Sequence, residues 1–323
     1  MPKFPNSARG AVITGWGTAL PPKVLTNHDL EQMFDTSDEW IVERTGIRER
    51  HVGGTTAGLS IEAGRLALEM SGLELGDIDG LVLATTTPDR QLPATSAVVQ
   101  SELGLRCGAF DVNAACSGFV YALVVAHGLI AIGAKKLLVI GTDTLARVVD
   151  WEDRNTAILF ADGSGAVVLE AVEGPGQLLA WDLDADGSLG RLLWADVGGY
   201  INMEGKEVFR RAVRIMVDSA TKSLDHAGLT ADDISLVIPH QANIRIISAA
   251  CERLGIDVSK AVTVLDRTGN TSSASVPLAL ADALDTGRVK EGDLLLLVGF
   301  GGGMTAASAV LRWGGGAPAG EPA

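Results

Sequence analysis

The sequence has few cysteines and few positive charges, and each shortage excludes a class of protein. Its three cysteines, Cys107, Cys116 and Cys251, are odd in number and irregularly spaced, which argues against a disulfide framework and against a zinc site. We therefore expect a reducing compartment and no bound metal. The formal net charge of −14 disfavours nucleic acid and anionic membranes as partners, because contacts with phosphate need a basic surface.

Long hydrophobic runs are also missing. No segment reaches the roughly 18 consecutive apolar residues that span a bilayer, and the N-terminal stretch does not read as a signal peptide. We expect a cytoplasmic protein. Its 323 residues, 47% of them hydrophobic, are enough to bury a large core in two domains or in one layered unit.

What the sequence does have is a regular alternation of apolar, strand-like segments with helical ones. Apolar strands that alternate with helices are typical of an α/β protein whose sheet is buried on both faces. The expected strands are the segments AVITGWG, GLVLATT, KLLVIGTD, GAVVLEA, SLVIPH, AVTVLD, DLLLLVGFGGG and ASAVLRW.

The order of these segments is duplicated within the chain. The stretch LEMSGLELGDIDGLVLA matches LDHAGLTADDISLVIPH, with Gly72 aligned to Gly228 and Asp77 to Asp233. The offset is constant, since 228 minus 72 and 233 minus 77 both give 156. Two further pairs of segments match in the same order, LLVIGTD with LLLVGFG and GSGAVVLE with TAASAVLRW. The sequence therefore predicts two copies of one βα unit.

The boundary between the two halves is expected at the turn-forming residues VEGPGQ. We expect an N-terminal half over residues 1–173 and a C-terminal half over residues 174–314. The glycine- and proline-rich end, residues 315–323, is expected to be disordered.

Duplication brings three polar residues toward one crevice. Cys116 follows the strand-like GAFDVN, His240 ends the strand VIPH, and Asn270 lies in DRTGNTSSAS. Ligands of open α/β sheets bind at the carboxyl ends of strands, so the three side chains are expected to lie together. Each also has a structural explanation: a cysteine that fills space, a core or surface histidine, and an asparagine in a turn or helix cap.

Cys116 stands at the start of the apolar helical stretch CSGFVYALVVAHGLIAIG. The positive end of a helix dipole favours thiolate over thiol, which makes Cys116 a candidate nucleophile. The glycine run GFGGGM, residues 299–304, lacks the Lys-Ser/Thr of a phosphate-binding loop. Its backbone N–H at Gly302 and that of Cys116 are candidates for an oxyanion hole, with a simple chain reversal as the alternative.

Several of these stretches carry a resemblance to a known family. The chain resembles 3-oxoacyl-[acyl-carrier-protein] synthase III, of the thiolase superfamily, in TSDEWIVERTGIRERH, DVNAACSGF, ILFADGSGAVVL, PHQANIRI, DRTGNTSSASVPLAL and GFGGGMT. The resemblance implies an α/β thiolase-like fold whose duplicated halves pack in five layers, α-β-α-β-α. It also implies a homodimer that uses no cofactor.

The same resemblance implies the reaction. Cys116 would accept an acyl group from acyl-CoA, and malonyl-acyl carrier protein would then condense with it, losing carbon dioxide. His240 and Asn270 would hold the enolate formed on decarboxylation. The product would be 3-oxoacyl-acyl carrier protein, which starts fatty acid synthesis.

Binding residues are carried over one by one from the resemblance. Those implied for CoA are Trp40, Arg44, Arg154, Asn243 and Arg245, and those implied for the acyl pocket are Leu92 and Phe160. Those implied for docking of the acidic carrier protein are Arg210, Arg211, Arg214 and Arg245. The family's primer gate is often aromatic, and Leu92 in its place predicts a deeper slot for branched or medium-length primers.

Two other functions stay open from the sequence. A starter-unit or acyl-transfer synthase of polyketide or specialised metabolism would keep the same three residues and use another acceptor. A thioesterase-like cysteine hydrolase would use His240 as general base and Asn270 to orient it. Product analysis separates the hydrolase, because it releases free acid without carbon dioxide from a malonyl donor.

Overall fold

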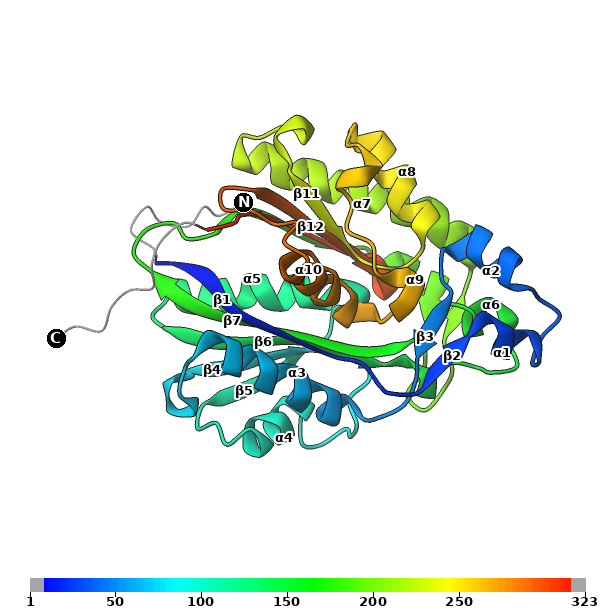
Figure 1. Ribbon diagram of the computed structural model, residues 1–323, viewed down its shortest axis with the longest axis horizontal. Helices are drawn as coiled ribbons and strands as arrows, with labels where there is room; N and C mark the ends of the chain where they lie inside the picture. Colours follow the sequence, from blue (N-terminus) through cyan, green and yellow to red (C-terminus); the bar gives the residue numbers. More distant parts are fainter. Residues whose placement is uncertain (1–8, 315–323) are drawn as a thin grey trace.

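Two large β-sheets, each with helices on both faces, form the centre of the fold (Figure 1). The computed structural model describes residues 9–314. The expected disordered end, residues 315–323, lies outside the described residues.

The first sheet combines antiparallel and parallel pairs. Its strand order is β1 (Gly10–Ala19), β7 (Asp162–Val172), β6 (Lys136–Thr144), β4 (Gly80–Ala84) and β5 (Gly108–Val112). The strands β1, β7 and β6 pair antiparallel, whereas β4 pairs parallel with both β6 and β5. Every residue of β4 is buried, as its continuous apolar sequence predicts, and every residue of β7 is buried too, including Asp162 and Glu170.

The second sheet repeats this order with one strand fewer. Its strands are β8 (Leu178–Ala185), β13 (Thr305–Arg312), β12 (Leu294–Gly301) and β11 (Leu236–Pro239). The first two pairs are antiparallel and the β12–β11 pair is parallel, as at the matching positions of the first sheet. The duplication that the sequence predicts is therefore present in the strand order itself.

The segment AVTVLD, residues 261–266, is not the strand that its sequence suggests. Only an isolated bridge joins Ala261 to Val237, and the short helix α9 (Leu265–Thr268) begins soon afterwards. The buried amide of Gln241 donates to Val262 O and accepts from Val264 N–H. The side chain of Gln241 thus makes backbone hydrogen bonds that a neighbouring strand would otherwise make. The apolar pattern of the segment gives no sign of this contact.

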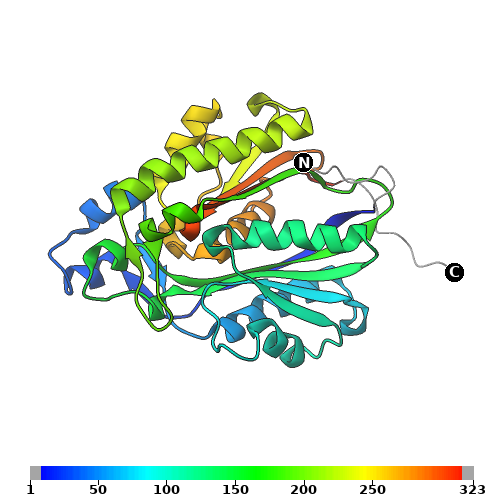
Figure 2. The same cartoon turned by 180° about the vertical axis from the view of Figure 1, so that it is seen from behind.

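Helices fill the layers between and outside the sheets (Figures 1 and 2). The helices α5 (Gly118–Ala131) and α10 (Ser275–Asp285) lie between the two sheets. One outer layer holds α3 (Thr56–Ser71) and α4 (Thr95–Glu102), and the other holds α7 (Gly205–Ala227) and α8 (Ile244–Leu254). The arrangement is the five-layered α-β-α-β-α architecture that the resemblance implies.

The remaining elements are short. They are the strand pairs β2 (Val24–Thr26) with β3 (Glu49–His51) and β9 (Leu193–Trp194) with β10 (Asn202–Met203), and the helices α1 (Asn27–Glu31), α2 (Asp38–Thr45) and α6 (Arg154–Ala157). The 3₁₀ turns are η1 (Leu75–Asp77), η2 (Ala115–Ser117), η3 (Leu145–Arg147), η4 (Gly187–Leu192), η5 (Ala231–Asp233), η6 (Val258–Lys260), η7 (Ser272–Ala274) and η8 (Gly302–Met304).

The two halves also match in local detail. Gly72 and Gly228 end α3 and α7 in the left-handed conformation, at φ 70° and 69°, where a side chain would be strained. Each glycine is followed by a 3₁₀ turn and then by a buried parallel strand. The expected boundary between residues 173 and 174 lies in the connection from β7 to β8. The division of the chain into two domains at this point stays a prediction.

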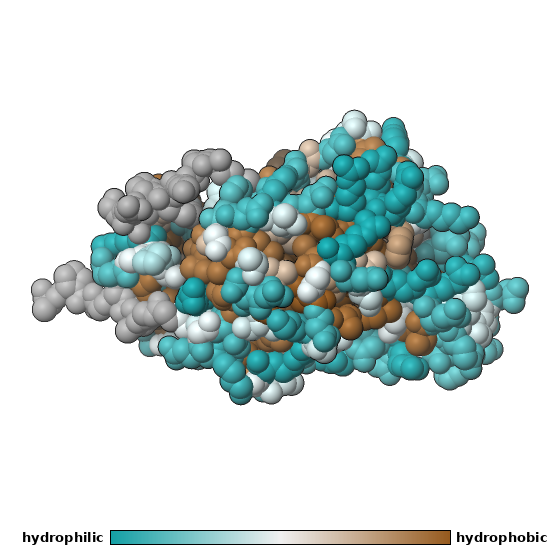
Figure 3. Space-filling view, turned by 90° about the horizontal axis from the view of Figure 1, so that it is seen from above, coloured by the Kyte–Doolittle hydropathy of each residue, from teal (hydrophilic) through white to brown (hydrophobic). Residues whose placement is uncertain are grey.

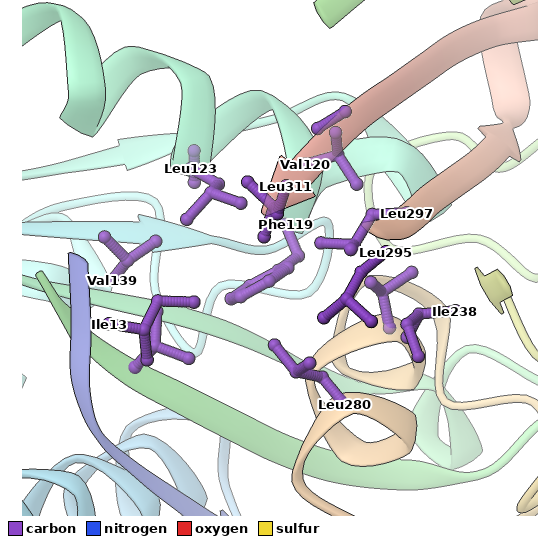
Figure 4. Close-up of a cluster of buried hydrophobic side chains, with 14 of the residues drawn as sticks. Ile13, Phe119, Val120, Leu123, Val139, Ile238, Leu280, Leu295, Leu297 and Leu311 are labelled. Atoms are coloured by element: carbon purple, nitrogen blue, oxygen red, sulfur yellow. The ribbon is translucent and has the colours of Figure 1, made fainter. Parts of the chain in front are cut away.

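The largest hydrophobic cluster lies in the middle layer, between the sheets (Figure 4). Phe119 and Leu123 of α5 contribute to it together with Leu280 of α10 and Leu295 of β12, all at 0% exposure. The helix α5 is buried on almost every side, as its sequence predicts. This packing fixes the start of α5, where Cys116 lies, against the second half of the chain.

The surface carries hydrophobic residues along the middle of the face seen from above, with hydrophilic residues on both margins (Figure 3). Single exposed hydrophobic residues are normal on protein surfaces. Within residues 9–314, no helix is both long enough and apolar enough to cross a membrane.

The buried side chain of His127 is expected to make the free energy of unfolding depend on pH. His127 in α5 is 5% exposed; Nδ1 donates to Leu123 O, and Nε2 has no partner among the described residues. Burial lowers the pKa of His127 from 6.5 to about 4. Between these values the unfolded chain binds more protons than the folded one, so the free energy of unfolding decreases as pH falls.

We expect His127→Leu to remove about 3 kcal/mol of the stability loss that occurs between pH 6.5 and pH 4. Urea unfolding at a series of pH values measures this loss. The same substitution at the exposed His226 is the control. An unchanged pH profile in His127→Leu would show that His127 does not titrate in this way.

Candidate active site

One cavity contains Cys116, His240 and Asn270, which come from distant parts of the chain. Cys116 lies in η2, directly before α5, and His240 follows β11. Asn270 forms a bridge with Phe160, in which Asn270 N donates to Leu159 O. The apolar part of the lining includes Leu159, Phe160, Leu193, Met203, Val208, Phe209, Ile246 and Phe300. The structure therefore brings together the three polar residues that the repeat predicts at one crevice.

The thiol of Cys116 lies in surroundings that disfavour its charged form. Burial raises its pKa from 9.0 to about 12, and the hydrogen bond from Ser272 Oγ, 3.3 Å from Sγ, opposes part of this increase. At 8% exposure a charged sulfur loses most of its hydration. Burial thus acts against the helix start, and the expectation that the helix start favours the thiolate stays a prediction.

The amide of Asn270 has a defined orientation. Its Oδ1 accepts the backbone N–H of Ser272 at 3.0 Å. This contact assigns the oxygen and the nitrogen, because a backbone N–H needs an acceptor. The Nδ2 group is then the end of the side chain left to donate to a ligand in the cavity.

His240 is held by a buried serine and by an aromatic ring. Its Nδ1 lies 2.6 Å from Ser275 Oγ, and its ring packs edge-on against Phe300, with centroids 5.4 Å apart. Burial lowers the pKa of His240 to about 3, so the imidazole is neutral near pH 7. A neutral imidazole offers one N–H donor and no positive charge.

A buried carboxylate anchors the segment that makes these contacts, the serine segment (residues 270–275, NTSSAS). Asp143 Oδ2 accepts from both N and Oγ of Ser273, at 3.0 and 2.7 Å. The other carboxylate oxygen accepts from the side chains of Thr85, Thr86 and Thr87. Asp143 thus ties the serine segment of the second half to β4 and β6 of the first.

No motif in the sequence points to a role for Asp143, Ser272, Ser273 or Ser275. The available indication was the presence of three serines where an apolar helix begins, since buried hydroxyls need partners. The sequence does not show which partner each hydroxyl finds.

The glycine run approaches the backbone of Cys116 closely. A Cβ at Gly301 would lie 2.5 Å from Cys116 N, and one at Gly302 would lie 2.9 Å from Leu193 O. Only glycine fits at these contacts. The close approach agrees with an oxyanion hole at this point, whereas the assignment of its second N–H to Gly302 stays a prediction.

Two arginines of the predicted CoA site contact the ring of Trp40. The guanidinium carbons of Arg44 and Arg154 lie 4.6 and 4.8 Å from the centroid of the Trp40 ring. Asn243 connects this group with the cavity, because it lines the cavity and donates through Nδ2 to Arg44 O. It also caps α8 by accepting from Arg245 N.

The two residues predicted for the acyl pocket occupy different environments. Phe160 is 3% exposed and lines the cavity. Leu92 is 83% exposed, in the connection between β4 and α4, and does not line the cavity of its own chain. A contribution of Leu92 to a slot across a dimer interface stays a prediction.

The basic sector predicted on α7 is partly paired within the helix. Arg210 and Arg211 share one carboxylate, that of Glu207, at 2.7 and 2.8 Å, and Arg214 pairs with Asp218 at 3.4 Å. These two carboxylates offset two of the three positive charges. By contrast, Arg245 is exposed at the start of α8, with its guanidinium carbon 5.5 Å from the Phe209 centroid, and forms no ion pair within residues 9–314. Among the arginines predicted for carrier docking, Arg245 is therefore the one without an ion-pair partner in the described residues.

Comparison with known proteins decides the family. The model described as 3-Oxoacyl-[acyl-carrier-protein (ACP)] synthase III matches residues 110–187, which include Cys116. The model of the C-terminal part of the same family matches residues 224–313, which include His240 and Asn270. The chain is also 49% identical over 329 residues to the beta-ketoacyl-[acyl-carrier-protein] synthase III of Roseiflexus castenholzii, covering 96% of this chain and 100% of that protein.

The chain belongs to the 3-oxoacyl-[acyl-carrier-protein] synthase III family.

Solved structures of this synthase family have the same fold. The structure of 3-oxoacyl-[acyl-carrier-protein] synthase III from Aquifex aeolicus aligns with a TM-score of 0.92 at 47% identity, covering 94% of this chain and 100% of that one. A priming beta-ketosynthase of the R1128 polyketide pathway aligns with a TM-score of 0.90 at 34% identity, covering 97% and 99%. The predicted thiolase-like α/β fold is confirmed by these alignments.

Proposed function

We propose that the chain condenses an acyl-CoA primer with malonyl-acyl carrier protein to give 3-oxoacyl-acyl carrier protein, carbon dioxide and CoA. Membership of the synthase III family supports this function. The observation that carries it is a single buried cavity with one thiol and two neutral N–H donors, those of His240 and Asn270.

The first half-reaction transfers the acyl group to Cys116. The sulfur attacks the thioester carbonyl of acyl-CoA, the C–S bond to CoA breaks, and the thiol proton leaves with CoA as CoA–SH. The developing oxyanion is held by backbone N–H groups next to the glycine run.

The second half-reaction forms the carbon–carbon bond. Decarboxylation of the malonyl group leaves an enolate, whose oxygen accepts hydrogen bonds from His240 and Asn270. The carbanion attacks the acyl carbonyl, the bond to Cys116 breaks, and the released sulfur takes up a proton. Two donors aimed at developing charge stabilise the transition state more than the substrate.

Product analysis tests this function. The protein is incubated with an acyl-CoA, weighed intact, and digested to locate the acylated peptide; malonyl-acyl carrier protein is then added. We expect acyl-Cys116, then carbon dioxide and 3-oxoacyl-acyl carrier protein in equal amounts. Free acid without carbon dioxide would indicate a hydrolase instead.

A starter-unit synthase of polyketide metabolism is the second candidate. The 34% identity to a priming ketosynthase supports it, although several synthase III relatives are near 49% identical. The two candidates are distinguished by the rate of condensation with malonyl groups on two carrier proteins, one from fatty acid synthesis and one from polyketide synthesis. We expect condensation to be faster with the carrier protein of fatty acid synthesis.

The cation–aromatic group at Trp40 supports binding of the CoA adenine by Trp40, Arg44 and Arg154. An adenine ring stacks on an indole face, and guanidinium groups attract the phosphates. We expect Trp40→Ala to raise the KM for acyl-CoA about tenfold, since such contacts contribute about 1–2 kcal/mol. The KM for malonyl-acyl carrier protein is the internal control, and an equal rise in both would contradict the assignment.

Arg245 is the main residue that we propose for docking of the acidic carrier protein. It carries a positive charge with no ion pair among the described residues, at the rim of the cavity. The residues Arg210, Arg211 and Arg214 contribute less, because each is already paired. Arg245→Ala should therefore weaken carrier binding more than Arg210→Ala, as measured by the KM for malonyl-acyl carrier protein.

A homodimer also belongs to the proposed function. The strand β5 lies at the edge of the first sheet, Phe110 on it is 39% exposed, and Leu92 nearby in the chain is 83% exposed. Leu92 would then complete the acyl slot of a second copy, in which branched or medium-length primers fit. Analytical sedimentation tests the homodimer, and we expect a particle of two chains. Rates of transacylation across a series of acyl-CoA primers test the slot, and we expect branched or medium-length primers to react.

A further inference from the structure

The hydrogen bond between His240 and Ser275 determines which ring nitrogen carries the proton. His240 Nδ1 and Ser275 Oγ are 2.6 Å apart, and the two residues are 1% and 0% exposed. A neutral imidazole has a hydrogen on only one nitrogen. Either Ser275 donates to Nδ1, or Nδ1 donates to Ser275, and the two cases present different atoms to the substrate.

The surroundings of Ser275 favour the first case. Within residues 9–314, the Ser275 hydroxyl has no hydrogen-bond partner other than Nδ1. If Nδ1 carried the hydrogen, the serine proton would be buried without an acceptor, at a cost of about 1–3 kcal/mol. If the serine donates, both buried groups are satisfied and the hydrogen of the ring lies on Nε2.

We propose that Ser275 is a positioning residue that holds His240 in the tautomer protonated at Nε2. The proposal rests on the proposed function, in which the malonyl thioester carbonyl accepts a hydrogen bond from His240. The ring nitrogen turned away from Ser275 then meets the carbonyl as a donor, and no proton has to move before decarboxylation. Because the ring is neutral near pH 7, its tautomer alone decides whether it can donate there.

The serine segment thereby orients both donors of the second half-reaction. The Ser272 N–H holds Asn270 Oδ1, which leaves Nδ2 to donate, and Ser275 acts in the same way on His240. Two side chains that could each accept or donate are thus both presented as donors. Acylation of Cys116 does not use either donor, so the loss of Ser275 should affect one half-reaction only.

Kinetics of Ser275→Ala test this separation. We expect the rate of decarboxylation and condensation to fall about tenfold, and Cys116 acylation to stay within about twofold, as the loss of one hydrogen bond implies. The matched control is Ser223→Ala, because Ser223 is also 0% exposed and also makes a 2.6 Å hydrogen bond, to Ser308 Oγ. Ser275→Thr keeps the hydroxyl and should condense faster than Ser275→Ala.

Nitrogen NMR of the full chain with ¹⁵N-labelled histidine provides a measurement that does not depend on activity. The signals of His240 are assigned by their loss in His240→Gln. We expect Nε2 protonated and Nδ1 accepting a hydrogen bond, with Nδ1 moving toward the unbonded position in Ser275→Ala but not in Ser223→Ala.

A His240 protonated at Nδ1 would overturn the proposal, as would equal losses of acylation and condensation in Ser275→Ala. Failure of the unmodified chain to acylate or condense would refute the proposed function instead. The NMR spectrum would still decide the tautomer.

Discussion

Cys116→Ala is expected to abolish acylation by acyl-CoA and to lower condensation by at least about a thousandfold. The cavity holds one thiol, and the nearest hydroxyl, that of Ser272, is a much weaker nucleophile that already donates to the sulfur. Alanine fills most of the space, so the fold should survive. Intact mass after incubation with acetyl-CoA, and the rate of formation of 3-oxoacyl-acyl carrier protein, measure both effects.

Cys107→Ala is the matched control for this variant. Cys107 packs against the outer cluster beneath α3 and does not line the cavity, so its loss should leave acylation unchanged. An acyl group on the peptide of Cys107 or Cys251, or full condensation by Cys116→Ala, would contradict the assigned nucleophile. Retained secondary structure in the circular dichroism spectrum excludes misfolding as the cause of a loss.

The repeated architecture could be predicted because its signals are local and periodic. Gly72 and Gly228 mark matching helix ends, and continuous apolar runs mark the buried strands on either side. Pseudo-symmetry then places the ends of equivalent strands face to face. Cys116, His240 and Asn270 follow such strands or lie near their ends, and they line one cavity.

The features that could not be predicted depend on contacts between distant residues. The segment AVTVLD has a strand-like pattern, but Gln241 takes its hydrogen bonds. The helix start at Cys116 suggests a thiolate, but the second half of the chain buries the sulfur and raises its pKa. In each case a long-range contact acts against the local preference.

The ion pairs of the arginines on α7 could be predicted from the sequence. Glu207 stands three and four residues before Arg210 and Arg211, and Asp218 stands four after Arg214. Such spacings place opposite charges side by side on a helix. The pairing observed on α7 follows from this rule, and among the arginines predicted for docking it leaves Arg245 without an ion pair in the described residues.

Asn270→Ala should separate the two half-reactions more strongly than any other substitution in the site. Cys116 should still acylate at a similar rate, because attack on acyl-CoA does not need the amide. Decarboxylation of malonyl-acyl carrier protein should fall about 100-fold to 1,000-fold, the usual effect of removing one donor from a developing oxyanion. Acylation is followed by intact mass and decarboxylation by release of labelled carbon dioxide.

The variant Asn270→Asp tests whether Asn270 acts through hydrogen-bond donation by Nδ2 or through the shape of its side chain. One carboxylate oxygen can still accept the Ser272 N–H, so the other replaces Nδ2 where the enolate oxygen lies. Two negative charges then repel each other, and decarboxylation should be slower than in Asn270→Ala. If the aspartate variant decarboxylates faster than the alanine variant, Asn270 acts through its shape, and His240 alone supplies the hydrogen bond to the enolate.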